Sequence, residues 1–107
     1  IVIVSDGPDN AKFDTDAPSG SIIESNKTTF TCSVDTNPGA TIHLTGPMGL
    51  DVERSNVIEL VYSILDIGGN HSGIYTCHSV NDKTGIEMEE TRNIQVKCKL
   101  MSKNELN

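Results

Sequence analysis

The stretch Asn70-His71-Ser72-Gly73-Ile74-Tyr75-Thr76-Cys77 decides the fold of this chain. A Tyr stands two residues before a Cys, directly after a turn that contains Gly73. This spacing is typical of a tyrosine corner, in which the phenol near the start of a strand bonds back to the preceding turn. The alternation of Tyr75 and Cys77 also places both side chains on one face of the predicted strand. We therefore expect a β-sandwich.

The rest of the chain also favours an all-β fold. Residues 28–34 and 90–96 keep a period of two, and no segment sustains the apolar spacing of a helix. We expect a loop over residues 9–20 and strands at 21–24, 28–34, 40–45, 50–54, 57–65, 73–80 and 86–97. The side chains expected to face the core are Thr28, Phe30, Cys32, Val34, Ile42, Leu44, Leu60, Tyr62, Ile64, Ile67, Tyr75, Cys77, Ile94 and Val96.

From about residue 8 to residue 99, the sequence resembles domains of the immunoglobulin superfamily. The segments that carry the resemblance are Phe30-Thr31-Cys32-Ser33-Val34, Leu60-Val61-Tyr62-Ser63-Ile64 and Ser72-Gly73-Ile74-Tyr75-Thr76-Cys77. The resemblance implies an antiparallel Greek-key sandwich of about 7–8 strands, of the constant-like or intermediate set. It also implies that Cys32 and Cys77, which are 45 positions apart, form a disulfide between the two sheets.

Two residues depart from the pattern of that family. His71 stands where the family usually has an Asp that pairs with an Arg across the end of the sandwich. The chain has no Trp, and Leu44 takes the position where the family usually packs a Trp on the disulfide. Because Leu is smaller than Trp, we expect Phe30, Tyr62 or Met48 to fill the space.

The 107 residues suffice for one domain of this kind. We expect residues 1–7 to be a leading strand or a linker from a preceding module. Residues 8–99 would form the immunoglobulin-like domain, and residues 100–107 would be a polar tail. The β-prone residues 1–4 fit either the last strand of a preceding domain or the first strand of this one.

Composition and motifs exclude several classes of function. The net charge of −7 argues against nucleic acid or an anionic membrane surface as a partner. No apolar run reaches the roughly 18 residues that a membrane-spanning helix needs, so we expect no membrane insertion. The sequence has no nucleophile elbow, no zinc-protease motif and no phosphate-binding glycine loop. We therefore expect no enzyme activity, no cofactor and no metal site.

Two tripeptides indicate the compartment. Asn26-Lys27-Thr28 and Asn70-His71-Ser72 fit the N-glycosylation pattern, and both fall in expected surface turns. Together with the disulfide-spaced cysteines, they favour an extracellular protein, either secreted or part of a cell-surface ectodomain. The alternative is a cytosolic module with reduced thiols.

Cys98 is the third cysteine and lies just past the last expected strand. An odd cysteine in a secreted protein indicates either a disulfide to a partner outside the chain or a free thiol. We expect the external disulfide, with a buried or capped thiol as the alternative.

Binding residues are expected at the pole opposite Asn26 and Asn70 and on the outer face of the sheet that contains strand 73–80. His43 and His78 are expected to point outward on neighbouring strands of that face. The open interpretations of this pair are a metal site, a pH-sensing patch and two solvated imidazoles. Because that face lacks exposed aromatic residues, a weak or avidity-based contact is favoured. The candidate binding residues are Asp35, Asn37, His43, His78, Asn81, Asp82 and Lys83.

These observations favour a non-catalytic recognition or adhesion module that contacts a protein, a glycan or neighbouring immunoglobulin modules. One alternative is a structural spacer in a tandem array. Another is the immunoglobulin module of a secreted invertebrate immune lectin, whose sugar-binding domain would lie outside these 107 residues.

Overall fold

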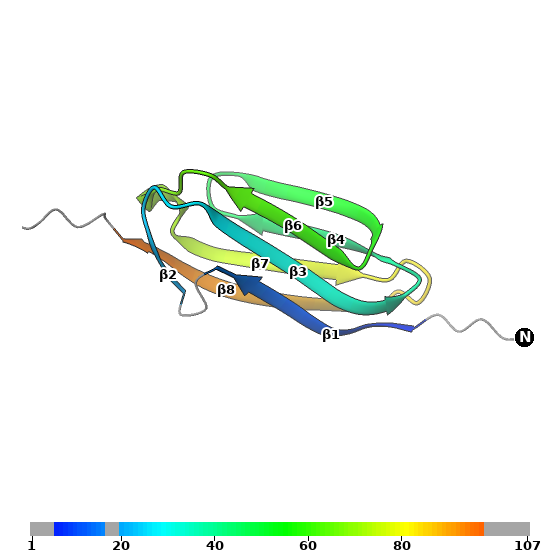
Figure 1. Cartoon of the computed structure of the whole chain (residues 1–107). Coiled ribbons are helices and arrows are strands. Elements are labelled where there is room, and N and C mark those ends of the chain that lie inside the picture. Colours follow the sequence, from blue (N-terminus) through cyan, green and yellow to red (C-terminus); the bar gives the residue numbers. More distant parts are fainter. Residues whose placement is uncertain (1–5, 17–19, 98–107) are drawn as a thin grey trace, which may run out of the picture.

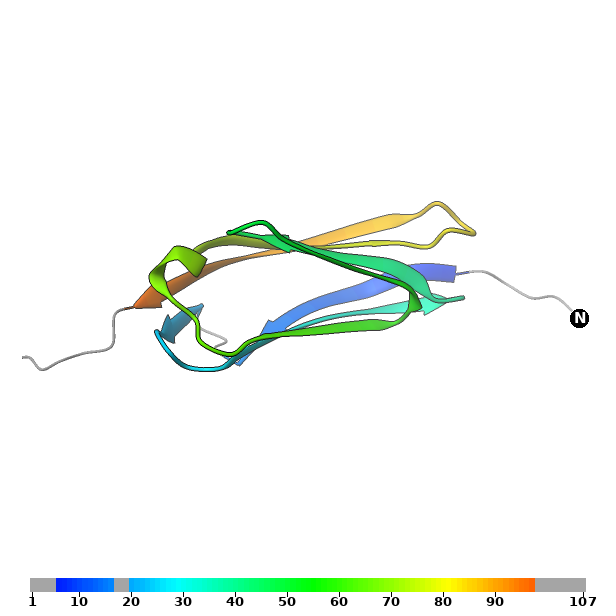
Figure 2. The same cartoon turned by 90° about the horizontal axis from the view of Figure 1, so that it is seen from above.

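The computed structural model describes residues 6–16 and 20–97. Within them, two sheets lie face to face, as Figure 1 shows from the side and Figure 2 from above. No helix in these ranges is long and apolar enough to cross a membrane. The elements are β1 (Asp6–Thr15), β2 (Ser21–Ile23), β3 (Thr28–Asn37), β4 (Ala40–Gly46), β5 (Leu50–Val57), β6 (Glu59–Ile64), the 3-10 helix η1 (Gly69–His71), β7 (Gly73–Val80) and β8 (Glu87–Lys97).

One sheet has the strand order β1-β3-β6, and the other has the order β2-β8-β7-β4-β5. The strand pairs are antiparallel, except that β2 runs parallel to β8. The two strands that carry the core cysteines, β3 and β7, lie inside their sheets rather than at the edges. The eight strands and two sheets confirm the expected all-β sandwich.

The expected strands agree with the structure over most of the chain. β7 covers the predicted residues 73–80, whereas β5 extends to Val57 and β6 is limited to Glu59–Ile64. The expected loop at residues 9–20 is wrong, because most of this segment belongs to β1, which pairs with β3. Phe13 is buried and Ala11 packs against the core, while the residues between and beside them are exposed. Register shifts between Asp6 and Lys12 interrupt this alternation near Pro8.

The described residues cover only part of the three segments into which the chain was expected to divide. Asp6 and Gly7, which fall in the expected leading strand or linker, are the first residues of β1. The leading residues 1–5, Cys98 and the tail at residues 100–107 lie outside the described residues. The limits drawn at residues 8 and 99 thus remain predictions.

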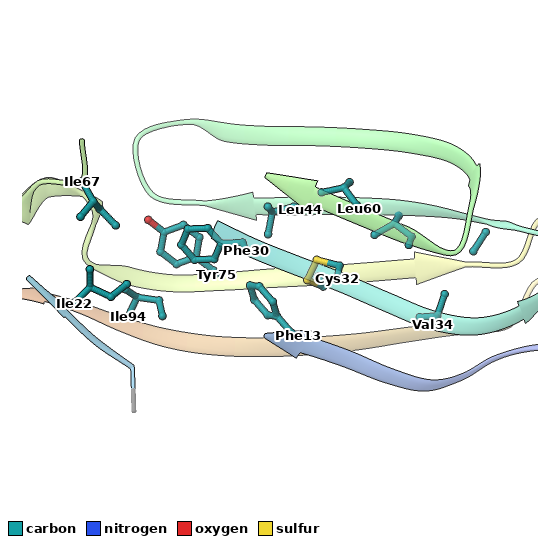
Figure 3. Close-up of a cluster of buried hydrophobic side chains, with 13 residues drawn as sticks. Phe13, Ile22, Phe30, Cys32, Val34, Leu44, Leu60, Ile67, Tyr75 and Ile94 are labelled. Carbon is teal, nitrogen blue, oxygen red and sulfur yellow. A yellow bond between two sulfur atoms is a disulfide. The ribbon is translucent and has the colours of Figure 1, made fainter. Parts of the chain in front are cut away.

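The centre of the core joins the two sheets covalently and by ring packing. A disulfide links Cys32 of β3 to Cys77 of β7, as the resemblance implied. Beside it, the rings of Phe30 and Tyr75 stack at 4.6 Å between centroids, and Phe13 packs on Phe30 at 6.2 Å (Figure 3). Such aromatic pairs contribute roughly 0.5–1.5 kcal/mol beyond the burial of their area.

Leu44 is fully buried and lies opposite Cys77 in the β4–β7 register, in accord with its expected place near the disulfide. Of the residues expected to fill the space of the missing Trp, Phe30 is fully buried and Tyr62 is partly buried against the core. Met48 does not contribute, because its side chain is 62 % exposed. It sits in the turn between β4 and β5, where its φ is positive at 62°.

The tyrosine corner forms as expected. The Tyr75 hydroxyl donates a 2.6 Å hydrogen bond to the carbonyl oxygen of His71, the last residue of η1. The His71 ring accepts a 2.9 Å hydrogen bond at Nδ1 from the Gly68 amide, and this bond helps to hold the turn before β7. Gly46 must lack a side chain, since a Cβ there would lie 2.5 Å from the Tyr75 ring.

Removal of the disulfide should be strongly destabilising. The link closes a loop of 45 residues, for which the chain-entropy model gives about 4 kcal/mol. We expect Cys32→Ala/Cys77→Ala to lower the free energy of unfolding by about 3–4 kcal/mol in urea titrations. The wild-type protein under reducing conditions should lose the same amount, while the double variant should not respond to reductant. A loss below about 1 kcal/mol would contradict the entropic account.

Stability should also fall at alkaline pH because of Tyr75. Burial, and secondarily the neighbouring Tyr62, raises the pKa of Tyr75 above its ordinary value of 10.0. The unfolded chain therefore loses this proton first, so the stabilisation is complete below pH 10 and is lost as pH rises through the folded pKa. Tyr75→Phe should cost about 0.5–1.5 kcal/mol at pH 7 and flatten the decline above pH 10 in urea titrations. Tyr62→Phe should keep that decline.

Candidate functional site

The two poles of the sandwich are built as the sequence predicted. The Ser25 amide donates to the Ile67 carbonyl at 2.7 Å, and the Ile67 amide donates to the Asn26 carbonyl at 3.4 Å. These bonds hold the β2–β3 turn against the segment before η1, which contains Asn70. The Glu24 amide bonds to the last residue of β8, so this is also the pole where β8 ends (Figure 1). Asn26 and Asn70 are both exposed there.

The opposite pole consists of the β3–β4 loop and the β7–β8 loop, and Asn81 joins them. Its Nδ2 donates to Thr36 Oγ1 at 3.2 Å and to the Asn37 carbonyl at 3.3 Å. Its Oδ1 accepts from the amides of Lys83 at 2.9 Å and Thr84 at 3.3 Å. Four hydrogen bonds from one side chain therefore fix the shape of both loops.

Asn81 was expected to contact a partner, and the structure corrects this. The residue is 0 % exposed, because its amide lies between the two loops rather than on top of them. It is a structural residue of the pole. Its partners Thr36 and Asn37 lie 45 and 44 residues away in the sequence, so no local pattern reveals its role.

The other expected residues of this pole are exposed. Asp35 accepts a hydrogen bond from Asn10 at 3.2 Å, and Asp82 accepts one from Thr41 at 3.1 Å. Asn37 and Lys83 also lie at the surface. A polar hollow of about 390 Å³ adjoins Asp35 on β1 and β3. The pole thus offers charged and amide groups on a loop framework that Asn81 holds in place.

His43 and His78 lie directly opposite each other on β4 and β7, as expected. Each ring is held by a carboxylate of its outer neighbour rather than by the other histidine. His78 Nε2 lies 2.5 Å from Glu87 Oε1, and His43 Nε2 pairs with Asp51 Oδ1. Across residues 6–16 and 20–97, no three or more Cys, His, Asp or Glu side chains gather as a metal site.

Two further carboxylates complete this row. Glu53 of β5 is the register partner of His43, and Glu89 of β8 is the register partner of His78. The outer face of the five-stranded sheet therefore carries a stripe of two histidines between two pairs of acids, which we call the histidine stripe. Its members are Asp51, Glu53, His43, His78, Glu87 and Glu89. The acids could be found from the sequence only once the strand register was known.

A second hollow of about 340 Å³ lies between β5 and β6, at the end that contains His71. Its lining includes Leu50, Val52, Tyr62 and Ile64, which are partly buried and pack against the core. β5 and β6 belong to different sheets, so the hollow is the opening of the sandwich along that side. No motif or pattern in the sequence predicts this hollow.

Loss of the Asn81 side chain should loosen the pole. We expect Asn81→Ala to lower the free energy of unfolding by about 2–4 kcal/mol, because four hydrogen bonds to a buried amide are lost. Amide hydrogen exchange of Lys83 and Thr84 should accelerate. Lys83→Ala, an exposed change in the same loop, should stay within about 0.5 kcal/mol of the wild type. Equal effects of the two variants would refute this role.

Comparisons with known proteins rest on structure alone. No protein-family model matches the sequence, and a search of curated proteins finds no match. Among solved structures, the Ig1 domain of mouse SynCAM 2 is similar, with a TM-score of 0.59 and 18% identity over 73% of this chain and 89% of that one. Titin M4 gives a TM-score of 0.57 and 20% identity over 72% and 84%.

A fragment of twitchin from C. elegans, which contains a protein kinase and immunoglobulin domains, gives a TM-score of 0.61 and 16% identity. The similarity covers 82% of this chain and 21% of that fragment. At such low identities the comparisons establish the architecture, which agrees with the sheets, the disulfide and the tyrosine corner described above. The chain therefore has the fold of an immunoglobulin-like domain.

Proposed function

We propose that this domain is a non-catalytic recognition module of an extracellular protein, and that it binds a basic protein surface through the histidine stripe. The observation that carries the proposal is the alignment of four carboxylates beside His43 and His78 on one exposed sheet face. The adjoining β7–β8 loop, which presents Asp82 and Lys83, would form the edge of the contact.

Electrostatic complementarity supports this choice of partner. The stripe carries four negative charges and at most two positive ones, so a surface rich in Lys and Arg would be attracted to it. The net charge of −7 would add long-range steering toward such a surface. Since the stripe offers no aromatic anchor, single contacts would be weak, and several copies would bind by avidity.

The extracellular setting is part of the same proposal. The disulfide that joins the two sheets would persist in an oxidising compartment, and both sequon asparagines are exposed. A role in adhesion or immunity would follow from this setting and from the partner that the domain binds.

A structural spacer is the second candidate, and one observation favours it. β1 begins at the pole of the β7–β8 loop, and β8 ends at the pole of Asn26 (Figure 1). Neighbouring modules attached at these two points would form a head-to-tail array. In such an array the histidine stripe would face the side and would have no required partner.

Charge reversal distinguishes the two candidates. The chain, displayed as a tetramer, is tested against a panel of secreted and cell-surface ectodomains and against a glycan array. For each partner found, we expect Glu89→Lys to weaken binding roughly tenfold, which corresponds to about 1.4 kcal/mol. Binding should also weaken with added salt.

Asp14→Lys is the matched control, since it makes the same change at an exposed position of β1 in the other sheet. It should change binding less than about twofold, within the range of surface substitutions away from a contact. Partners that respond equally to both variants, or to neither, would refute the histidine stripe as the binding surface.

A further inference from the structure

One buried polar atom has no explanation in the folded domain. Thr28 begins β3 and is only 1 % exposed, and within the described residues its Oγ1 has no hydrogen-bond partner. It belongs to the inward row of β3, whose next members are Phe30, Cys32 and Val34. A buried hydroxyl without a partner is unfavourable, and Val has nearly the same shape without this disadvantage.

The hydroxyl of Ser72 provides an informative contrast. Its Oγ accepts a 2.9 Å hydrogen bond from the Val96 amide, and so it ties the start of β7 to the end of β8. Folding alone therefore accounts for Ser72, although this residue is also the third position of a sequon, Asn70-His71-Ser72. Folding does not account for Thr28.

Thr28 is the third position of the other sequon, Asn26-Lys27-Thr28. N-glycosylation requires a hydroxyl residue two positions after the acceptor asparagine. Asn26 itself is exposed in the turn between β2 and β3, and Ser25 beside it has a positive φ of 72°. A sugar chain attached to its side chain would extend into solvent without displacing the core.

We propose that Asn26 carries an N-linked oligosaccharide, and that the Thr28 hydroxyl is present for this modification rather than for the fold. The inference rests on the extracellular setting proposed above and not on the binding surface. It concerns Asn26 specifically, since the hydroxyl of the second sequon has a structural role.

The transfer step requires an oligosaccharide carried on a lipid diphosphate. The Asn26 Nδ2 forms a bond to the anomeric carbon of the first sugar, and the bond from that carbon to the diphosphate oxygen breaks. The lipid diphosphate leaves with the electron pair, and the amide nitrogen gives up one proton to a base. Because Thr28 is inaccessible once β3 has paired and packed, the transfer must precede folding of this strand.

The test uses the full chain, secreted from a glycosylating eukaryotic cell and, separately, produced with its disulfide in bacteria. Peptide N-glycosidase in heavy-oxygen water converts a glycosylated asparagine to labelled Asp, which peptide mass spectrometry assigns to Asn26 or Asn70. We expect label at Asn26 in the wild type and in Thr28→Ser, and none at that position in Thr28→Val or Asn26→Gln.

The bacterial proteins test the structural half of the inference without any glycan. Thr28→Val should raise the temperature of unfolding by roughly 4 °C or more, since it removes the unpartnered hydroxyl. Ser72→Ala should lower that temperature, because the Val96 amide loses its acceptor. An unlabelled Asn26 in the secreted wild type, or a lower unfolding temperature for Thr28→Val, would overturn the inference. Neither result would bear on binding through the histidine stripe.

Discussion

The structure depends on the contact between β3 and β7 at the centre of the sandwich. The disulfide between Cys32 and Cys77 fixes one residue of each sheet against the other, and the stacked rings of Phe30 and Tyr75 lie two residues away on the same strands. These pairs set which face of each strand is inward. A shift of one residue in either strand would expose an aromatic ring and bury a polar neighbour.

The outer face of the five-stranded sheet follows from this constraint. Leu44 and Cys77 are register partners and both point into the core. Because side chains alternate along a strand, the preceding residue on β4 and the following residue on β7 must both point outward. These are His43 and His78, which are register partners as well. The packing of Leu44 and Cys77 in the core therefore determines that the two histidines of the stripe lie on the outer face.

Sequence reasoning succeeded where one segment contained the whole pattern. The Tyr75–Cys77 spacing and the inward alternation of β3 required no knowledge of distant residues. β1 was missed because Gly7, Pro8 and the irregular register up to Lys12 obscure a short alternation around Phe13.

The site was predicted less completely than the core, because its residues come from several segments that are far apart in the sequence. The approach of His43 to His78 followed from two strands expected to be neighbours. Their carboxylate partners Asp51 and Glu87 depend on the register of two further pairs, and that register cannot be read from alternation alone. Asn81 was misjudged because a polar residue in a loop suggests exposure. Its burial arises from loops that are brought together only in the folded domain.

Asn81 and Thr28 are both polar and buried, but only Asn81 is explained by the needs of folding. Both are almost fully buried, yet Asn81 makes four side-chain hydrogen bonds, whereas Thr28 Oγ1 has no partner among the described residues. The first is a residue that the fold requires, because replacing it would leave several backbone groups unpaired. The second is a residue that the fold only tolerates. Its presence is better explained by the sequon Asn26-Lys27-Thr28, to which the oligosaccharide is transferred before the chain has folded.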